Sequence, residues 1–316
     1  MRTSILSAVF VTAIATSVWA SPCAEEGTFG AITFKTEGEY PWDTTCVATI
    51  DASGEDDFIV EKDYTVDKIV FSRAFKAYQH QTIVLPISFD KSGFIDGGSV
   101  FEISELAHYS KYEPWQIVCK ETKPENMKAN TPYIMQAYQN DGITIATNNG
   151  GSITIHKTSS KDNPVFRFAD NWEFRGTYTY KKWGEGDSQI GHVYGFAANS
   201  KDKVQAGQFV KVKAGAFIKP LRAYLYYDKK SSSGTKRPAA NGVNGMAAIE
   251  DDDLPSTIDV VFKDENGETT SIGRMNTVTG EISAATGWFD MKGRRLSKKP
   301  TQKGTYFNNG KKVVIK

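Results

Sequence analysis

Flat aromatic rings beside carboxylates can bind sugars, and one short segment of this chain combines them. Residues 180–187 read YKKWGEGD. The rings of Tyr180 and Trp183 could stack on a sugar, Glu185 and Asp187 could accept hydrogen bonds from its hydroxyls, and the glycines favour an exposed loop. We therefore predict that Tyr180, Trp183, Glu185 and Asp187 form a carbohydrate-binding platform.

The alternative place for each tryptophan is the hydrophobic core. Trp115 and Trp172 lie in strand-like runs, so we expect them to be buried. For Trp183 the exposed loop and the core stay open as alternatives.

The sequence contains none of the common catalytic motifs that we searched for. The sequence lacks a Gly-x-Ser-x-Gly elbow, a His-Glu-x-x-His zinc motif and a Gly-x-x-x-x-Gly-Lys-Ser/Thr phosphate loop. Carboxylate pairs such as Glu102 with Glu105, or Asp170 with Glu173, could support glycoside hydrolysis, but 37 acidic residues produce such pairs by chance. The four histidines and three cysteines show no metal-ligand spacing. We assign no catalytic residue, no metal and no cofactor.

The elements that must position these residues are β-strands. Between residues 27 and 227, short apolar or alternating runs are separated by turn residues such as Asn140-Asp141-Gly142 and Asn149-Gly150-Gly151. This spacing predicts an all-β fold with a large antiparallel β-sandwich, of jelly-roll type or a similar one, over residues 21–228. The region forms either one unit or two subdomains, about 21–148 and 149–228.

The composition changes after this region. Residues 229–256 contain a serine run, a Pro-Ala-Ala-Asn-Gly stretch and the acidic run 250–253, which predicts a flexible linker. Residues 257–316 return to strand-like runs and predict a small C-terminal β-sandwich domain. The net charge of the whole chain is only +1, so we expect no nucleic-acid partner.

The first residues predict a secretory signal peptide over 1–20. Arg2 precedes the apolar stretch Ile5–Ile14, and Val18-Trp19-Ala20 fits signal peptidase cleavage. No other segment has the apolar length of a membrane span, so we expect no transmembrane segment in the mature chain.

An exported chain meets an oxidising compartment, where cysteines can pair. A Cys23–Cys46 bridge would leave Cys119 as a buried apolar residue, and a Cys46–Cys119 bridge is the alternative.

The last 29 residues are the most informative. Residues 288–316 read WFDMKGRRLSKKPTQKGTYFNNGKKVVIK, with strand-like pieces at Trp288–Met291, Thr305–Phe307 and Lys312–Ile315. Asn308-Asn309-Gly310 is a strong hairpin signal because Asn and Gly accept the positive φ of a tight turn.

This segment resembles the C-terminal sorting domain of cargo proteins of the type IX secretion system. The resemblance rests on Trp288-Phe289-Asp290, Gly293-Arg294-Arg295 and Gly304-Thr305-Tyr306, followed by Asn309-Gly310-Lys311-Lys312-Val313. It implies passage across the outer membrane of a Gram-negative bacterium, with the secretion machinery as partner. It also implies that the machinery recognises the following residues: Asp290, Gly293, Arg294, Gly304, Tyr306, Gly310 and Lys311.

Two internal segments look like β-sandwich modules of exported surface proteins from bacteria that use this route. In one, Arg73-Ala74-Phe75 leads to the run Gln81–Pro86, and in the other, Phe217 leads to Leu221-Arg222-Ala223-Tyr224. This likeness implies no particular chemistry.

Together these features predict a secreted or cell-surface β-sandwich protein without enzymatic activity, which binds a polysaccharide or another envelope component. Two alternatives stay open: a secreted glycan-degrading enzyme with an unrecognised carboxylate pair, and a structural spacer on the cell surface.

Overall fold

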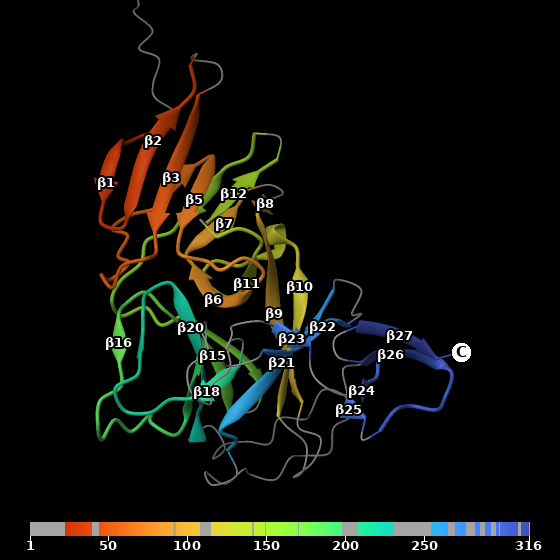
Figure 1. The fold of residues 1–316 in the computed structure, drawn as a ribbon. Coiled ribbons are helices and arrows are strands. Elements are labelled where there is room, and N and C mark those ends of the chain that lie inside the picture. Colours follow the sequence, from red (N-terminus) through yellow and green to blue (C-terminus); the bar gives the residue numbers. More distant parts are fainter. Residues whose placement is uncertain are drawn as a thin grey trace, which may run out of the picture.

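The protein is all-β, as the sequence predicts (Figure 1). The structure, a computed structural model, describes residues 23–39, 44–90, 93–107, 115–140, 142–148, 150–169, 171–197, 208–229, 254–264, 269–275, 282–284, 288–291, 295–296, 298–308 and 311–315. The predicted signal peptide lies outside these residues. Within them the only helical element is a single 3-10 turn, η1 (Pro124–Asn126).

A six-stranded sheet and a three-stranded sheet form the N-terminal end of the molecule. All their strand pairs are antiparallel except β3–β5, which is parallel. The six-stranded sheet has the order β1 (Gly27–Phe29), β2 (Ile32–Glu37), β3 (Thr45–Asp51), β5 (Lys68–Ser72), β12 (Ile143–Thr147) and β8 (Gly93–Asp96). The three-stranded sheet has the order β4 (Tyr64–Val66), β13 (Ile153–Ile155) and β7 (Ile87–Phe89).

A larger sheet of twelve strands forms the centre of the molecule. Its order is β14 (Val165–Ala169), β15 (Trp172–Thr177), β20 (Arg222–Tyr227), β17 (Val193–Phe196), β18 (Phe209–Lys211), β21 (Thr257–Lys263), β10 (Gln116–Thr122), β9 (Gly98–Ala107), β11 (Thr131–Ala137) and β6 (His80–Leu85). Two further strands, β22 (Thr269–Met275) and β23 (Ile282–Ala284), extend from β21. The sheet curls, because β14 and β15 lie against β9 and β11 from its other end.

Two small sheets complete the fold. The first pairs β16 (Lys181–Lys182) with β19 (Phe217–Ile218). The second has the order β25 (Arg295–Leu296), β24 (Trp288–Phe289), β26 (Gly304–Asn308) and β27 (Lys311–Ile315). Strands β26 and β27 form the hairpin that the sequence predicts, and their turn residues 309–310 lie outside the described residues.

The position of β21 corrects the predicted domain boundary at residue 257. Strand β21 does not begin a separate C-terminal sandwich. It pairs parallel with β10 and antiparallel with β18 inside the large sheet. The physical reason is that one face of β21 is apolar, and its Ile258, Val260 and Phe262 are buried in the large sheet's core. On the other face Val261 packs against Phe289 and Phe307 of the C-terminal sheet.

Two large cores divide the molecule, and strand β11 separates them. The first core lies between the six-stranded sheet, the three-stranded sheet and strands β6 and β11. The second core lies inside the curled large sheet. On β11, Tyr133, Met135 and Ala137 face the first core, whereas Ile134 faces the second. This is the alternation that the two-residue period of a strand requires.

The structure joins Cys23 to Cys46, the first of the two pairings that the sequence leaves open. Cys119 is buried on β10 as a free thiol. Burial raises the pKa of this thiol, so it stays protonated and unreactive. No helix in the described parts of the chain is both long enough and apolar enough to cross a bilayer.

Candidate functional site

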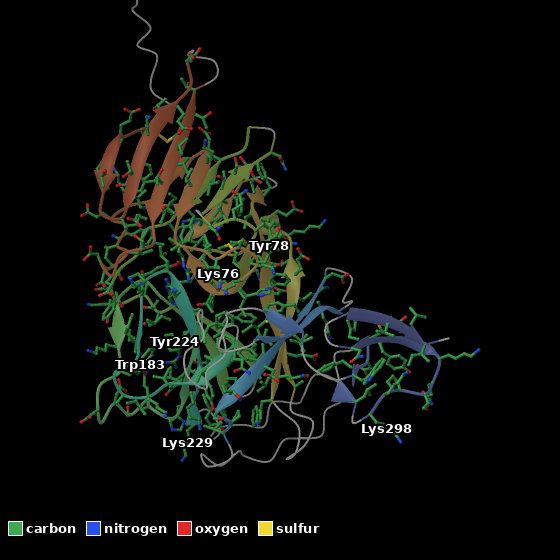
Figure 2. The ribbon with its side chains drawn as sticks, in the orientation of Figure 1. Lys76, Tyr78, Trp183, Tyr224, Lys229 and Lys298 are labelled. Carbon is green, nitrogen blue, oxygen red and sulfur yellow. A yellow bond between two sulfur atoms is a disulfide. The ribbon has the colours of Figure 1, made fainter. Side chains whose placement is uncertain are left out.

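Trp183 is not an exposed platform residue. Its side chain is only 1% exposed and packs with Val193, Val212, Ile218 and Tyr224 in a small core of its own (Figure 2). The indole Nε1 donates a hydrogen bond to Gln189 Oε1 at 3.1 Å. Of the two places that the sequence leaves open for Trp183, the structure shows the core, so this ring is not available to the predicted platform. The reason is local pairing, because the backbone of Trp183 exchanges hydrogen bonds with Ala216 and Gly215 next to β19 and draws the ring inward. Trp115 and Trp172 are buried, as predicted.

The other three residues of the predicted platform differ in exposure and in their contacts. Glu185 is exposed, and Asp187 is half-buried, where its Oδ1 accepts a hydrogen bond from the backbone N–H of Gln189 at 2.9 Å. Tyr180 is half-buried and stacks on Phe217, with ring centroids 5.7 Å apart and planes 24° apart. Phe217 is 53% exposed. An exposed aromatic pair therefore exists here, but its partner is Phe217 and not Trp183.

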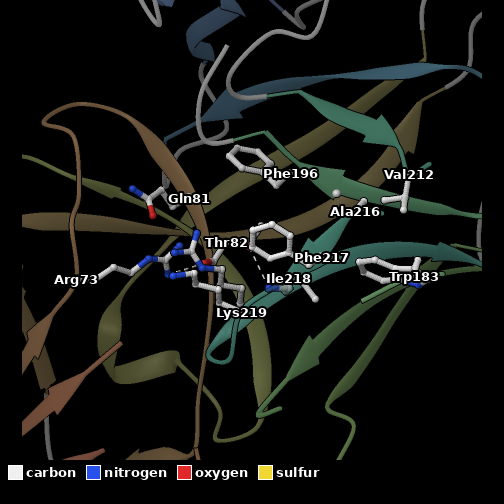
Figure 3. A pocket seen from close by; sticks show the side chains of 13 residues that line it. Arg73, Gln81, Thr82, Trp183, Phe196, Val212, Ala216, Phe217, Ile218 and Lys219 are labelled. Atoms are coloured by element: carbon white, nitrogen blue, oxygen red, sulfur yellow. Dashed lines mark hydrogen bonds between the residues drawn. The ribbon is translucent and has the colours of Figure 1, made fainter. Parts of the chain in front are cut away.

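Phe217 also lines a pocket of about 200 Å³ between the first core's edge and the strands of the second (Figure 3). The pocket joins segments far apart in the chain, from β6, β17, β19 and β20 and from the loops beside them. Its described lining residues are Arg73, Gln81, Thr82, Trp183, Gly195, Phe196, Val212, Ala216, Phe217, Ile218, Lys219, Arg222 and Ala223.

Two arginines give this pocket its charge. Arg73 follows β5 and is only 3% exposed, and its Nη1 donates a hydrogen bond to the carbonyl oxygen of Thr82 at 3.0 Å. Arg222 begins β20. The Nε atoms of both arginines are buried without a hydrogen-bond partner. Burial lowers the pKa of Arg73 well below its usual value, and the charge of Arg222 lowers it further. Burial alone lowers the pKa of Arg222.

The third cation of the pocket is already engaged. Lys219 Nζ donates to the carbonyl oxygen of Ser53 at 3.0 Å and lies 3.7 Å from Glu55 Oε1. The remaining wall is mainly apolar, from Phe196, Val212 and Ala216. The pocket thus combines a cationic interior, an apolar wall and an exposed aromatic ring.

A second exposed aromatic pair lies elsewhere. Tyr78, labelled in Figure 2, and Tyr138 are 63% and 42% exposed. Their ring centroids lie 6.0 Å apart, with planes 33° apart. The hydroxyl of Tyr138 hydrogen-bonds Ser99 Oγ, which also donates to Glu121 Oε1 at 2.7 Å. This pair is the natural comparison for Tyr180 and Phe217 in binding experiments.

Glu173 does not resemble a catalytic carboxylate. It is buried and forms ion pairs with both Arg167 and Arg175, the latter at 2.6 Å. Both ion pairs fix its side chain within the large sheet. Asp170, its possible partner in the sequence, lies outside the described residues.

Ser88, His156 and Asp63 are hydrogen-bonded in the order Ser–His–Asp, which is also the order in the catalytic triad of a serine hydrolase. Ser88 Oγ lies 2.8 Å from His156 Nε2, and His156 Nδ1 lies 3.3 Å from Asp63 Oδ2. In a hydrolase the acid is buried so that its charge orients the imidazole strongly. Here the Asp63 side chain is 59% exposed, and its carboxylate also accepts a hydrogen bond from the backbone N–H of Lys157. We assign these residues to a surface hydrogen-bond chain.

The residues implied in sorting lie on the C-terminal sheet where they are described. Asp290 follows β24, and Gly304 and Tyr306 belong to β26. The hydroxyl of Tyr306 donates to the carbonyl oxygen of Gln302 at 3.1 Å. Gly293, Arg294 and Gly310 lie outside the described residues, and Lys311 begins β27.

Sequence reasoning did not identify Arg73 and Arg222 as site residues. The signal was present, because the two segments that look like surface-protein modules, 73–86 and 217–224, are the ones that meet at the pocket. The sequence does not show that these two segments lie close together in the fold.

The described residues give no support for a metal site. They contain no group of three or more His, Cys, Asp or Glu side chains that could hold a metal ion. Comparisons with protein-family models, with curated proteins and with solved structures found no match to this chain.

Proposed function

We propose that this chain is an exported, non-enzymatic protein that binds a polysaccharide or another envelope component in the pocket between β6, β19 and β20. One observation carries the binding proposal: Phe217, an exposed ring stacked on Tyr180, stands at a pocket that several segments build together. Aromatic rings beside a concave, largely apolar site are a common arrangement for ligand binding. The pocket replaces the loop 180–187 as the centre of the predicted site.

The experiment is a glycan array with the full mature chain, residues 21–316. We expect Phe217→Ala to weaken binding at least about fivefold, which corresponds to about 1 kcal/mol. The matched control is Tyr138→Ala, which removes an exposed tyrosine from the other aromatic pair. No binding by the unaltered chain, or loss with Tyr138→Ala but not with Phe217→Ala, would overturn the proposal. Release of cleaved sugar in the same assay would instead favour the enzyme alternative.

The export half of the proposal rests on the sequence of the two chain ends and is tested separately. A periplasmic reporter fused to residues 288–316 should reach the cell exterior in a host that has the matching exporter. The control carries Gly293→Ala with Arg294→Ala and should stay in the periplasm. Retention of the unaltered fusion in the periplasm would contradict the proposed sorting role.

A further inference from the structure

The charge of the pocket is not balanced within the described residues. None of its described lining residues is acidic, and Lys219 already contacts Ser53 and Glu55. Arg73 and Arg222 have no ion-pair partner in the described parts of the chain. Two guanidinium groups therefore share a mostly buried space without a carboxylate.

This arrangement is costly unless something compensates it. A buried charge without a partner loses its hydration, and two like charges also repel each other. A guanidinium group cannot relieve the cost by releasing its proton near neutral pH. A buried water could satisfy each Nε but would bring no negative charge. No described lining residue supplies the missing negative charge, and a bound anion would supply it.

The hydrogen-bond geometry suits an anion. Arg73 is fixed by its bond to the Thr82 carbonyl oxygen, and Thr82 Oγ1 accepts a hydrogen bond from the Ala223 backbone N–H at 2.9 Å. The first bond ties Arg73 to β6 and the second ties β6 to β20, so both arginines stand on a common support. Their Nε–H groups remain available, and guanidinium donors match the oxygens of carboxylate, sulfate and phosphate.

We propose that Arg73 and Arg222 form an anion subsite, which binds a carboxylate, sulfate or phosphate group carried by the ligand. This inference rests on the proposed function in placing the ligand at this pocket, and it adds the chemical class: an acidic glycan and not a neutral one. The volume of about 200 Å³ holds one such group with part of a sugar ring. Phe217 is then placed to contact the remaining sugar surface.

The test measures binding of defined anions to the full mature chain by calorimetry and by thermal unfolding. The probes are inorganic phosphate, inorganic sulfate and glucuronate, with neutral glucose as the control ligand. We expect saturable binding of at least one anion, a rise in Tm with that anion, and no response to glucose. Absence of saturable anion binding to the unaltered chain overturns the inference.

Variants separate a binding role from a structural one. Arg222→Gln should weaken anion binding at least tenfold, and it should raise Tm in anion-free buffer because it removes a partly buried charge that lies close to the buried Arg73. Lys182→Gln removes an exposed cation from neighbouring β16 and should change neither quantity. Arg73→Gln is the second variant and should weaken anion binding in the same way. Unchanged anion binding in both arginine variants overturns the inference.

The outcomes also separate this inference from the proposed function. Binding of a neutral glycan that depends on Phe217 but not on Arg222 leaves the function and removes the anion subsite. Saturable binding of inorganic anions with no glycan binding leaves the subsite and removes the function. An acidic glycan that needs both Phe217 and Arg222 supports both.

Discussion

The two large cores are built differently, although they share strand β11. The first is mainly aliphatic, with Ile32, Ile50, Ile69 and Ile145 among its buried residues, and most of its members come from residues 23–155. The second is rich in aromatic rings, including Trp115, Trp172, Phe174, Tyr194 and Phe209. The first core is closed by strands that precede residue 156, with a few residues from later segments. The second needs β21 from beyond residue 256.

The first core is built mostly from one continuous stretch of the chain. The second core joins segments that are far apart in the sequence. The disulfide Cys23–Cys46 belongs to the first core, which is stabilised within its own segment. The second core depends on a parallel pairing, β10 with β21, whose strands are separated by most of the large sheet's sequence. Changes to each core should therefore have effects that can be told apart.

Truncation should have the largest effect and should act on the second core. A chain that ends at Asp228 lacks Ile258, Val260 and Phe262, whose burial is worth about 1.5–3 kcal/mol each. The sum is comparable with the total stability of a typical domain, about 5–15 kcal/mol. We expect loss of the near-ultraviolet circular dichroism of Trp115 and Trp172, and loss of amide protection in β10 and β18.

The matched control for this truncation is a chain that ends at Asp264, which keeps β21. This chain should retain the protection of β10 and β18. Equal behaviour of the two truncated chains would show that β21 does not complete the second core.

Removal of the disulfide should have a smaller effect, confined to the first core. Cys23→Ser with Cys46→Ser opens a loop with a sequence separation of 23 residues, which is worth about 3 kcal/mol. Amide exchange should report this loss in β2 and β3 while β15 and β20 stay protected. Cys119→Ala is the control, because it removes a buried sulfur from the second core only. An equal loss in both cores after disulfide removal would show that they unfold as one unit.

Gly176→Ala should have the smallest effect and should reach both cores. Gly176 lies on β15 where the strand crosses β6, and a Cβ there would come within 2.8 Å of the Val84 side chain. Such overpacking costs about 1–3 kcal/mol. Gly184→Ala, where a Cβ meets nothing within 4 Å, is the control and should be nearly neutral in chemical denaturation. Addition of Val84→Ala should recover part of the Gly176→Ala loss, and no recovery would contradict the contact.

The strands themselves could be predicted from the sequence, and their partners could not. The run Ile143–Thr147 is β12, and Leu221–Tyr227 contains β20, because alternation of apolar residues reports local structure directly. The alternation of apolar and polar residues in a strand carries no information about which other strand will pair with it. For Thr257–Phe262 the alternation indicated a strand with one buried face, Ile258, Val260 and Phe262, but it did not indicate that this face belongs to the large sheet. The serine-rich and acidic segment before it favoured a linker and a new domain instead.

The candidate site was less predictable than the fold. Glycines after Trp183 indicated an exposed loop, but the short pairing of β16 with β19 buries the ring. Arg73 and Arg222 look like ordinary polar positions at strand ends, which usually face solvent. Only the fold shows that both lie at one pocket, because the crossing of β6 and β20 that brings them together is a long-range contact.

Strand β21 is synthesised after its partners β10 and β18, so the second core can close only late in synthesis. Ribosomes add roughly 5–20 residues per second, so β10 and β18 exist for seconds before β21 is made. During that time their edges are open and the aromatic residues between them have no closed interior. For the export proposed above, a polypeptide that crosses a membrane unfolded would benefit from such a delay, and the order of the strands along the chain would provide it.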